Sequence, residues 1–508
     1  MNALSSATAL ITTIVAGLAL MFVWAGSESV YFDWAPMEGD LSLYEIAQVR
    51  SPVEEEPMTV ASTEPDPSIP ISTENVPSEV ADAVAAAMNS AGGQSDAPTA
   101  VMPKPARSRS RSGPQNCVLW ISIASFRGDY LEKAEAPFLK EVAGRGRTTS
   151  TLLPAFPTLH YPCLITQATG FPVSTHGISG NRMRDPETKQ LLDRPTKLSL
   201  LKAEPIWTLA KRQGLGVIVH DWPLSQEQPS GAAADVFLSS YDDAKTDDVR
   251  LSALLEAWSS FKGPTKIGLA MASIHDLEKA AMAHGSRDPA TFEAVTKMDA
   301  TLKTFFEKLE AAWPTLSDPG DKLYVVLTTD HGRADAEKVI NFTHLMGPLA
   351  EHVDVTVDSA VANIWFKEPP AGVTAEAYAK KYDEELRARI YWKSFPRGEY
   401  PSYLELGTGG PFIGDRILVL KAGYAFADAK GSEPVYSPSE TSGPFSFGGY
   451  PVRDSSRMKG QAFFFELQGG GRSGDLGDVS AAQLYPTVCD LLGLEPSPSV
   501  TAKALDVR

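Results

Sequence analysis

Residues 117–124 read CVLWISIA, a run of eight mostly apolar residues that decides the fold class. This pattern is typical of a strand in a parallel sheet that is covered on both faces, because side chains on either face are then buried. A helical stretch with apolar spacing follows it at residues 130–146 (YLEKAEAPFLKEVAGRG) and stops at a glycine.

The order of strand and then helix recurs along the rest of the chain. We predict helices at residues 206–214, 289–309 and 481–494, and strands at residues 215–222, 266–274 and 322–330. This alternation predicts an α/β sandwich with a central mixed, largely parallel sheet and helices on both faces. The unbroken apolar character of Cys117–Ile123 and Tyr324–Thr329 predicts that these two strands lie near the centre of the sheet.

Polar residues follow three of the predicted strands, at the edge where open α/β sheets bind ligands. They are Ala124–Arg127, His275–Asp276 and Thr329–Gly332. The last is the strongest chemical signal, because Asp330 and His331 are adjacent and can present a carboxylate and an imidazole to one divalent metal. A hydrogen-bonded turn is the alternative reading of the same pair.

The N-terminal region has a different composition. Residues 7–26 (ATALITTIVAGLALMFVWAG) carry no charge, and twenty helical residues span about 30 Å, the thickness of a bilayer core. We therefore predict a single transmembrane anchor, with a cleaved signal peptide or a buried helix as alternatives. A cytoplasmic leader at residues 1–6 and a large folded region behind the anchor favour a single-pass membrane protein whose main domain is extracytoplasmic, either periplasmic or extracellular.

Two segments separate this anchor from the folded region. Residues 27–49 form a juxtamembrane segment that interleaves acidic residues with Tyr31, Phe32, Trp34 and Tyr44, and we expect it to contact a protein partner or the membrane surface. Residues 50–115 are a linker rich in Pro, Ser and Glu that cannot bury enough apolar area to fold, apart from one short helix after Ser78. The α/β domain is predicted at residues 116–498, followed by a tail at 499–508.

Charge and cysteine content exclude several function classes. The chain has 508 residues with 46 Lys and Arg against 63 Asp and Glu, a net charge of −17. Such an acidic protein repels phosphate backbones, so we expect no nucleic-acid partner. The cysteines Cys117, Cys163 and Cys489 can form at most one disulfide and contain no Cys-x-x-Cys zinc motif.

Seven segments of the chain resemble, in their order, the nucleotide pyrophosphatase/phosphodiesterase branch of the alkaline phosphatase superfamily. They cover most of residues 116–498 and read ISIASFRGDYL (121–131), FPTLHYPCLITQATGFPVSTHGISGNRM (156–183), AEPIWTLAKRQG (203–214), VHDWP (219–223), VVLTTDHG (325–332), GPFIGDRILVLKAGYAF (410–426) and LYPTVCDLLGLEPSP (484–498). The resemblance implies an alkaline-phosphatase-like sandwich and a two-zinc phosphodiesterase, in which a Thr or Ser hydroxyl attacks phosphorus.

The sequence departs from the implied site at nearly every position. The aspartate that the resemblance implies after the first strand falls on Ala124, the threonine nucleophile on His160, and an asparagine that holds the phosphoryl group on Cys163. The third strand ends in SIHDLEKAAMAHG (273–285), where His275, Asp276 or Glu278 stands near the implied aspartate. Residues 448–451 lack the implied Gly-x-His-Gly histidine. Asp330 and His331 alone match the pattern.

These replacements predict a retained fold with a degenerate active site. We expect a pseudoenzyme without catalytic residues or a required cofactor, acting as a binding or accessory subunit of a membrane complex with a protein partner. The alternative is a metal-dependent phosphodiesterase with a residual site, in which His160, Asp330 and His331 hold at most one weakly bound divalent metal, zinc, and activate a water. In a variant of this alternative, His160 is itself the nucleophile. A third possibility is that the fold serves only as bulk in a larger assembly.

Overall fold

The computed structural model describes residues 113–226, 233–238, 242–426, 433–441, 443–469 and 471–508. The predicted leader, membrane anchor and juxtamembrane segment (residues 1–49) lie outside the described residues. So does nearly all of the predicted linker, with the short helix after Ser78. Among the helices that are described, none is both long and apolar enough to cross a membrane.

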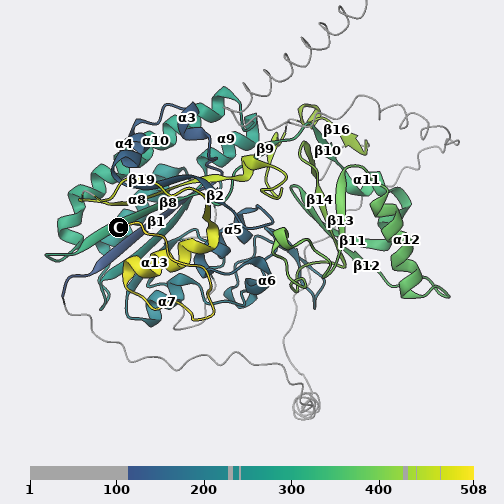
Figure 1. Cartoon of the computed structure of the whole chain (residues 1–508), viewed down its shortest axis with the longest axis horizontal. Helices are drawn as coiled ribbons and strands as arrows, with labels where there is room; N and C mark the ends of the chain where they lie inside the picture. The colour runs from purple at the N-terminus through teal and green to yellow at the C-terminus, as the bar shows by residue number, and fades with distance from the viewer. Residues whose placement is uncertain (1–112, 227–232, 239–241, 427–432, 442, 470) are drawn as a thin grey trace, which may run out of the picture. The chain divides into compact units, whose positions relative to one another are not determined.

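A nine-stranded mixed sheet forms the centre of the domain (Figure 1). It consists of β1 Asn116–Ile123, β2 Arg147–Leu153, β5 Gly216–His220, β6 Val236–Leu238, β7 Ile267–Ile274, β8 Lys322–Thr328, β18 Gly460–Glu466, β19 Gly474–Asp475 and β20 Val479–Ser480. The order is β19-β2-β18-β8-β1-β7-β5-β6, with β20 paired to β2. Strands β8, β1, β7, β5 and β6 run parallel, whereas β18 is antiparallel to β8 and β2. The predicted central position of β1 and β8 is confirmed.

Helices cover both faces of this sheet, as the sequence predicts. One face packs against α3 Tyr130–Lys133, α4 Pro137–Arg145, α8 Asp247–Ser260, α9 Asp276–His284 and α10 Pro289–Leu316, and the other against α5 His160–Thr169, α7 Ile206–Arg212 and α13 Leu484–Leu492. Alternate residues of β1 enter the two cores: Leu119 and Ile121 belong to the first, Val118 and Trp120 to the second. The apolar run is unbroken because neither face of the strand meets water.

A smaller antiparallel sheet lies to one side of the main one (Figure 1), and its order is β11-β12-β14-β13. It consists of β11 Val353–Asp358, β12 Val361–Phe366, β13 Trp392–Pro396 and β14 Arg416–Leu420. Helix α12 Ala375–Arg387 packs against it through Tyr378, Tyr382 and Leu386.

Short elements complete the domain. The remaining strands are β3 Arg182–Arg184, β4 Leu191–Asp193, β9 Ala334–Asp335, β10 Lys338–Ile340, β15 Tyr424–Phe426, β16 Val435–Tyr436 and β17 Ser446–Phe447. Short α-helices lie at α6 Val173–His176 and α11 Phe342–Met346, and 3-10 turns at Leu198–Leu200, Gly347–His352, Ser402–Leu404, Pro438–Thr441, Ser456–Met458 and Ala481–Gln483.

Two helix predictions need correction. The stretch at residues 130–146 is not one helix, because Ala134 is extended and a new helix begins at Pro137. Proline lacks an N–H and fixes φ, so it is suited to a first helical position, as at Pro137, although α10 continues through Pro314. The helix predicted at 289–309 continues to Leu316, and its start is capped by the Asp288 side chain, which accepts from the Ala290 amide.

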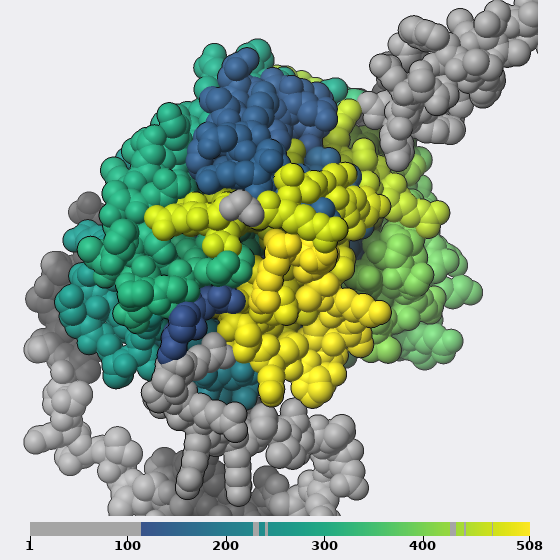
Figure 2. All heavy atoms as spheres, turned by 60° about the vertical axis from the view of Figure 1, so that its left-hand side comes forward, coloured from purple at the N-terminus to yellow at the C-terminus, as the bar shows by residue number. Residues whose placement is uncertain are grey.

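The C-terminal residues, predicted as a tail, pack against the domain. Val507 is buried in the same core as α13, and the Leu505 amide donates to the Thr487 hydroxyl. The C-terminal part of the chain (yellow in Figure 2) forms one continuous surface with the neighbouring segments. In the structure the domain therefore continues beyond residue 498.

A buried histidine on α6 predicts a loss of stability in acid. The Ile178 amide donates to His176 Nδ1 at 3.1 Å, so Nε2 carries the proton and faces the Thr166 hydroxyl at 3.0 Å. Protonating Nδ1 would place one N–H against another, and burial lowers the pKa of His176 to about 3. Since the unfolded chain takes up this proton near pH 6.5, stability is complete above that pH and falls by about 1.4 kcal/mol per pH unit between 6.5 and 3.

Urea unfolding at pH 7.5 and pH 5.0 measures this effect. We expect the chain to lose about 2 kcal/mol more than His176→Asn between the two pH values. Equal losses in the two proteins would contradict the assignment of His176 as the titrating group.

Candidate functional site

Four parallel strands end together at one edge of the central sheet. Strand β1 leads into Ser125, β5 into Asp221, β7 into His275 and β8 into Asp330. Three of these strand ends are predicted from the sequence. The fourth strand, β5, is also predicted, but its end is not singled out from the sequence, although Asp221 follows an apolar run and His220 there.

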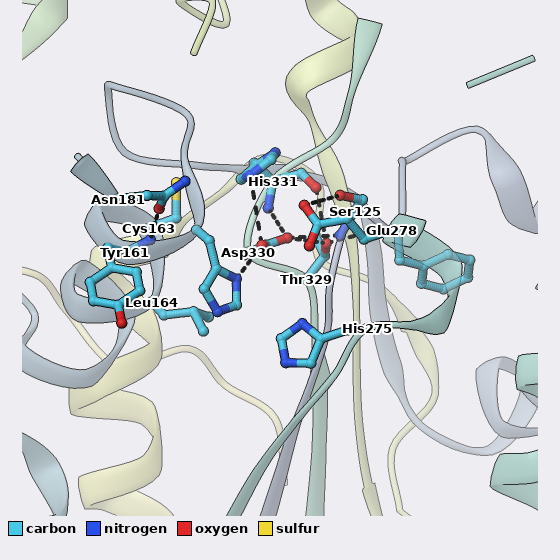
Figure 3. A network of polar contacts seen from close by, with 12 residues as sticks. Ser125, Tyr161, Cys163, Leu164, Asn181, His275, Glu278, Thr329, Asp330 and His331 are labelled. Carbon is cyan, nitrogen blue, oxygen red and sulfur yellow. Dashed lines mark hydrogen bonds and ion pairs between the residues drawn. The ribbon is translucent and has the colours of Figure 1, made fainter. Parts of the chain in front are cut away.

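His160 and Asp330 meet in a close contact at this edge, and Figure 3 shows Asp330 close to Thr329 and His331. His160 is the first residue of α5, and its Nδ1 lies 2.8 Å from Asp330 Oδ2. The other carboxylate oxygen accepts from the amides of Ser125 at 2.8 Å and His331 at 2.6 Å. His331 Nε2 lies 3.7 Å from Asp330 Oδ2. The structure therefore brings together the three residues that the sequence singles out as metal ligands.

The environment of the His160–Asp330 contact favours the charged forms of both side chains. Burial alone would raise the pKa of Asp330, but His331, His160 and the Ser125 amide together hold the pKa of this carboxyl well below its usual range. Burial alone would lower the pKa of His160, whereas the hydrogen bond and the charge of Asp330 raise it, and the net direction is upward. Both shifts favour an imidazolium facing a carboxylate.

A second buried ion pair lies at the end of β5. Arg250, on α8, is fully buried and donates from Nη1 to Asp221 Oδ2 at 2.7 Å and from Nη2 to the Asp242 carbonyl at 2.6 Å. His275 Nε2 lies 3.0 Å from the same Asp221 oxygen. The His275 ring is 5.3 Å from the His160 ring, so the second pair adjoins the first.

A third pair joins α9 to the segment after β8. Arg333 Nη1 donates to Glu278 Oε1 at 2.8 Å, and Ser125 Oγ lies 3.4 Å from the same oxygen. Burial is the largest influence on the pKa of Glu278 and raises it, as does the charge of Asp330, but Arg333 together with His160 and His275 holds this pKa below its ordinary value. Sequence reasoning names Glu278 but misses Arg333 and Arg250, because an arginine on a helix or after a turn is usually a surface residue.

The positions of the missing family ligands are closed. Ala124 is fully buried, and its amide donates to the Ile274 carbonyl at 2.9 Å. At Gly448 a Cβ atom would collide with the Thr158 carbonyl oxygen and lie 2.9 Å from His331 Cε1. Gly449 has a φ of +91°, which strains any other residue, and its Cβ would lie 2.9 Å from the Ala360 amide nitrogen.

The surroundings of Cys163 favour an unreactive thiol. Its sulfur is buried on α5 and lies 3.4 Å from the Ala155 carbonyl oxygen. Burial and the charge of Asp330 raise the pKa of this thiol well above its ordinary value. A cysteine that stays protonated is a poor nucleophile and a poor ligand. Cys117 and Cys489 are also buried and free.

This donor set does not fit the two-zinc centre that the resemblance implies. Two zinc ions need six Asp or His ligands in that family, whereas here the first aspartate is a methyl group and two of the remaining carboxylates bond to arginines. Within the described parts of the chain, no group of three or more His, Cys, Asp or Glu side chains is arranged to hold a metal ion. The single-metal reading of His160, Asp330 and His331 stays a prediction.

A polar groove lies outside this cluster. It has a volume of about 400 Å³ and is lined by the β3–β4 hairpin, by β11 and by the start of α11. Arg184 on its wall is already engaged, with Asp354 through Nη2 and with the Trp365 ring at 5.2 Å. We assign no role in the chemistry of the strand ends to this groove.

Comparison with known proteins agrees with this fold. A family model described as type I phosphodiesterase/nucleotide pyrophosphatase matches residues 118–450. Mouse ectonucleotide pyrophosphatase/phosphodiesterase family member 1 is 23% identical over 396 residues, which cover 75% of this chain and 41% of that protein. Human family member 7 is 25% identical over 238 residues, covering 44% of this chain and 50% of that protein. The chain thus spans about half or less of these two relatives.

Solved structures show the same fold. Murine ectonucleotide pyrophosphatase/phosphodiesterase 5 superposes with a TM-score of 0.63 at 21% sequence identity, covering 75% of this chain and 96% of that one. The human protein of the same name gives a TM-score of 0.64 at 20% identity, covering 77% and 97%. At such low identity the likeness is evidence for the architecture alone.

Proposed function

Because the chain belongs to the type I phosphodiesterase/nucleotide pyrophosphatase family, within the alkaline phosphatase superfamily, we propose that it is a pseudoenzyme of that family, which acts by binding rather than by hydrolysis. One observation carries the proposal. The carboxylates at the strand ends each bond to a cationic side chain of the protein: Asp330 to His160, Asp221 to Arg250, and Glu278 to Arg333. Carboxylates engaged in this way are not available as ligands for a pair of metal ions.

The chemistry of phosphodiester cleavage supports the same reading. In-line displacement with two metals needs an activated oxygen nucleophile and a cation beside the leaving group. His160 stands where the family resemblance implies the nucleophile, and the contact of its Nδ1 with Asp330 orients the ring. Loss of a nucleophile typically costs several orders of magnitude in rate, and here the ligands are replaced with it.

The expected rate of phosphodiester hydrolysis is the background rate. Hydrolysis of a chromogenic phosphodiester by the purified chain is to be measured with a chelator and with added zinc. Asp330→Asn, which changes the site by a single atom, serves as the matched control. We expect the two proteins to give the same rate under both conditions. Saturable turnover by the wild-type chain that Asp330→Asn abolishes would contradict the pseudoenzyme proposal.

A residual metal-dependent phosphodiesterase is the second candidate, favoured by the proximity of His160, Asp330 and His331. This reading needs the His160–Asp330 hydrogen bond to be replaced by bonds to a common ion. Elemental analysis after dialysis separates the two candidates. The pseudoenzyme retains less than one equivalent of zinc per chain, whereas a stable value near one, with turnover, favours the enzyme.

We further propose that the domain is tethered to a membrane, on its extracytoplasmic side, and serves as an accessory subunit of a membrane complex. The support is the uncharged run at residues 7–26, followed by the aromatic and acidic segment at 27–49 and the long linker at 50–115. The prefix "ecto" in the names of the relatives agrees with an outward-facing domain in those proteins. The net charge of −17 argues against nucleic acid as the partner.

Deleting residues 27–49 while keeping the anchor is expected to release the protein partner. Aromatic residues dominate the buried cores of protein interfaces, and this segment contains four of them. Detergent extraction of both forms, followed by identification of what co-purifies, measures the effect. A control with an equal length removed from the linker, residues 57–79, should keep its partners. Unchanged partners after the first deletion would contradict the assignment, as would the absence of any partner of the intact chain.

A further inference from the structure

Arg333 is buried and held by hydrogen bonds to Ser446 and to Glu278 of the strand-end cluster. It follows the Asp330-His331-Gly332 motif directly and is 5% exposed. Its Nε donates to the Ser446 hydroxyl at 3.0 Å, its Nη2 to the Ser446 carbonyl oxygen, and its Nη1 to Glu278 at 2.8 Å. With all three nitrogens engaged, the guanidinium has a fixed place and orientation.

Glu278, the partner of Arg333, is a carboxylate that needs a counter-charge. It lies on α9, directly after β7, in the segment where the family resemblance implies metal ligands. Its side chain is 15% exposed, and the charge of Asp330 acts on it, as do the charges of His160 and His275. A buried carboxylate beside another carboxylate is unfavourable unless a cation lies close to it.

We propose that the Arg333 guanidinium is the permanent cation of this site and takes over, beside Glu278, the charge-compensating task that a divalent metal performs in a metal-dependent member of the family. A bound metal stabilises a fold only as far as its concentration exceeds its dissociation constant. A guanidinium built into the chain has no such dependence. The folded domain therefore needs no divalent metal for its stability.

This inference concerns the stability of the fold, and it stands apart from the pseudoenzyme proposal. A chain that turned over a phosphodiester would overturn that proposal without touching the role of Arg333. Conversely, a domain that lost stability on metal removal would overturn the role of Arg333 even if it hydrolysed nothing. The activity assay and the double-mutant cycle below therefore fail independently.

The test is a double-mutant cycle on the full chain in detergent, read by urea unfolding. Arg333→Met is expected to raise the unfolding equilibrium constant by about 10²- to 10³-fold, because it leaves the buried Glu278 carboxylate without its cationic partner. Adding Glu278→Gln to Arg333→Met removes the unpaired charge. The unfolding equilibrium constant of the double variant is therefore expected to lie within about tenfold of the wild-type value. If the change in the unfolding equilibrium constant of the double variant equals the product of the changes in the two single variants, the proposal is overturned.

Arg416 provides a matched control in the smaller sheet. Its side chain is 7% exposed and pairs with Asp383, which is 18% exposed, close to the values of 6% and 15% for Arg333 and Glu278. Arg416→Met removes a buried arginine of the same kind, but Glu278→Gln should not rescue it. If Glu278→Gln restored the stability of both arginine variants, the glutamine would stabilise the fold whichever arginine is replaced. This result would overturn the specific pairing of Glu278 with Arg333.

The wild-type chain provides a second readout that needs no variant. Its thermal midpoint is expected to be the same after dialysis against EDTA and with 0.1 mM zinc chloride added. A midpoint that falls in EDTA and recovers with zinc would overturn the proposal. If Arg333→Met does not fold, this comparison decides the question, since a metal-dependent domain must respond to it.

Discussion

Replacing Asp330 with alanine is expected to lower the free energy of unfolding by about 3–5 kcal/mol. The carboxylate is fully buried, and its Oδ1 accepts from the amides of Ser125 and His331. Alanine leaves both amides without this acceptor, and each buried unsatisfied donor costs about 1–3 kcal/mol. His160 also loses the partner of its charge.

Asp330→Asn separates the hydrogen bonds from the charge. Its amide oxygen still accepts from the two backbone amides, while its NH₂ faces His160 Nδ1, which accepts in the neutral ring. We therefore expect a loss of about 1–2 kcal/mol, well below that of alanine. Chemical unfolding in the presence of EDTA measures both variants.

The size of these losses also distinguishes a structural aspartate from a metal ligand. Carboxylates grouped around an absent metal repel one another, so removing one of them leaves the metal-free fold unchanged or more stable. A loss of less than about 1 kcal/mol for Asp330→Ala in EDTA would therefore contradict the ion-pair reading of the site.

Replacing Arg250 with methionine is expected to cost about 3–5 kcal/mol. Arg250 has no exposed surface, and its partner Asp221 is 4% exposed. Methionine fills most of the volume of the arginine side chain but carries no charge. The Asp221 carboxylate then keeps its contact with His275 but loses the guanidinium. Unfolding monitored by circular dichroism or tryptophan fluorescence measures the loss.

Arg212 provides the control for Arg250. It makes two hydrogen bonds to Glu204, at 2.9 and 2.7 Å, but both side chains are more than a quarter exposed. Because water screens such a pair, Arg212→Met should cost less than about 1 kcal/mol. Equal losses for the two arginines would mean that burial does not govern the strength of these pairs, and would contradict the analysis of the site.

The sequence predicts the fold correctly where a local pattern of residues is compatible with a single structure. The run at Cys117–Ile123 is apolar at every position but Ser122, and only burial on both faces accounts for that. The break before Pro137 carried a visible signal in its proline, whereas the packing of Val507 against α13 did not. A short C-terminal segment is held by contacts that no periodic pattern records.

The site could be predicted only in part, for a physical reason. Asp330 and His331 lie at the end of a strand, so their place in the fold follows from the chain direction. Arg333 and Arg250 are important because of what lies across from them, Glu278 and Asp221, which are 55 and 29 residues away in the sequence. Neither arginine differs from a surface arginine until those long-range pairs are known.

The two adjacent glycines described beside His331 restrict the mutations that this loop can accept. A histidine at Gly448 would need the Thr158 backbone and the His331 ring to move first, and one at Gly449 would be strained by its φ of +91°. A further histidine therefore cannot be introduced at either glycine by a single substitution that leaves the backbone in place. An attempt to engineer one beside His331 has to remodel the loop together with the side chain.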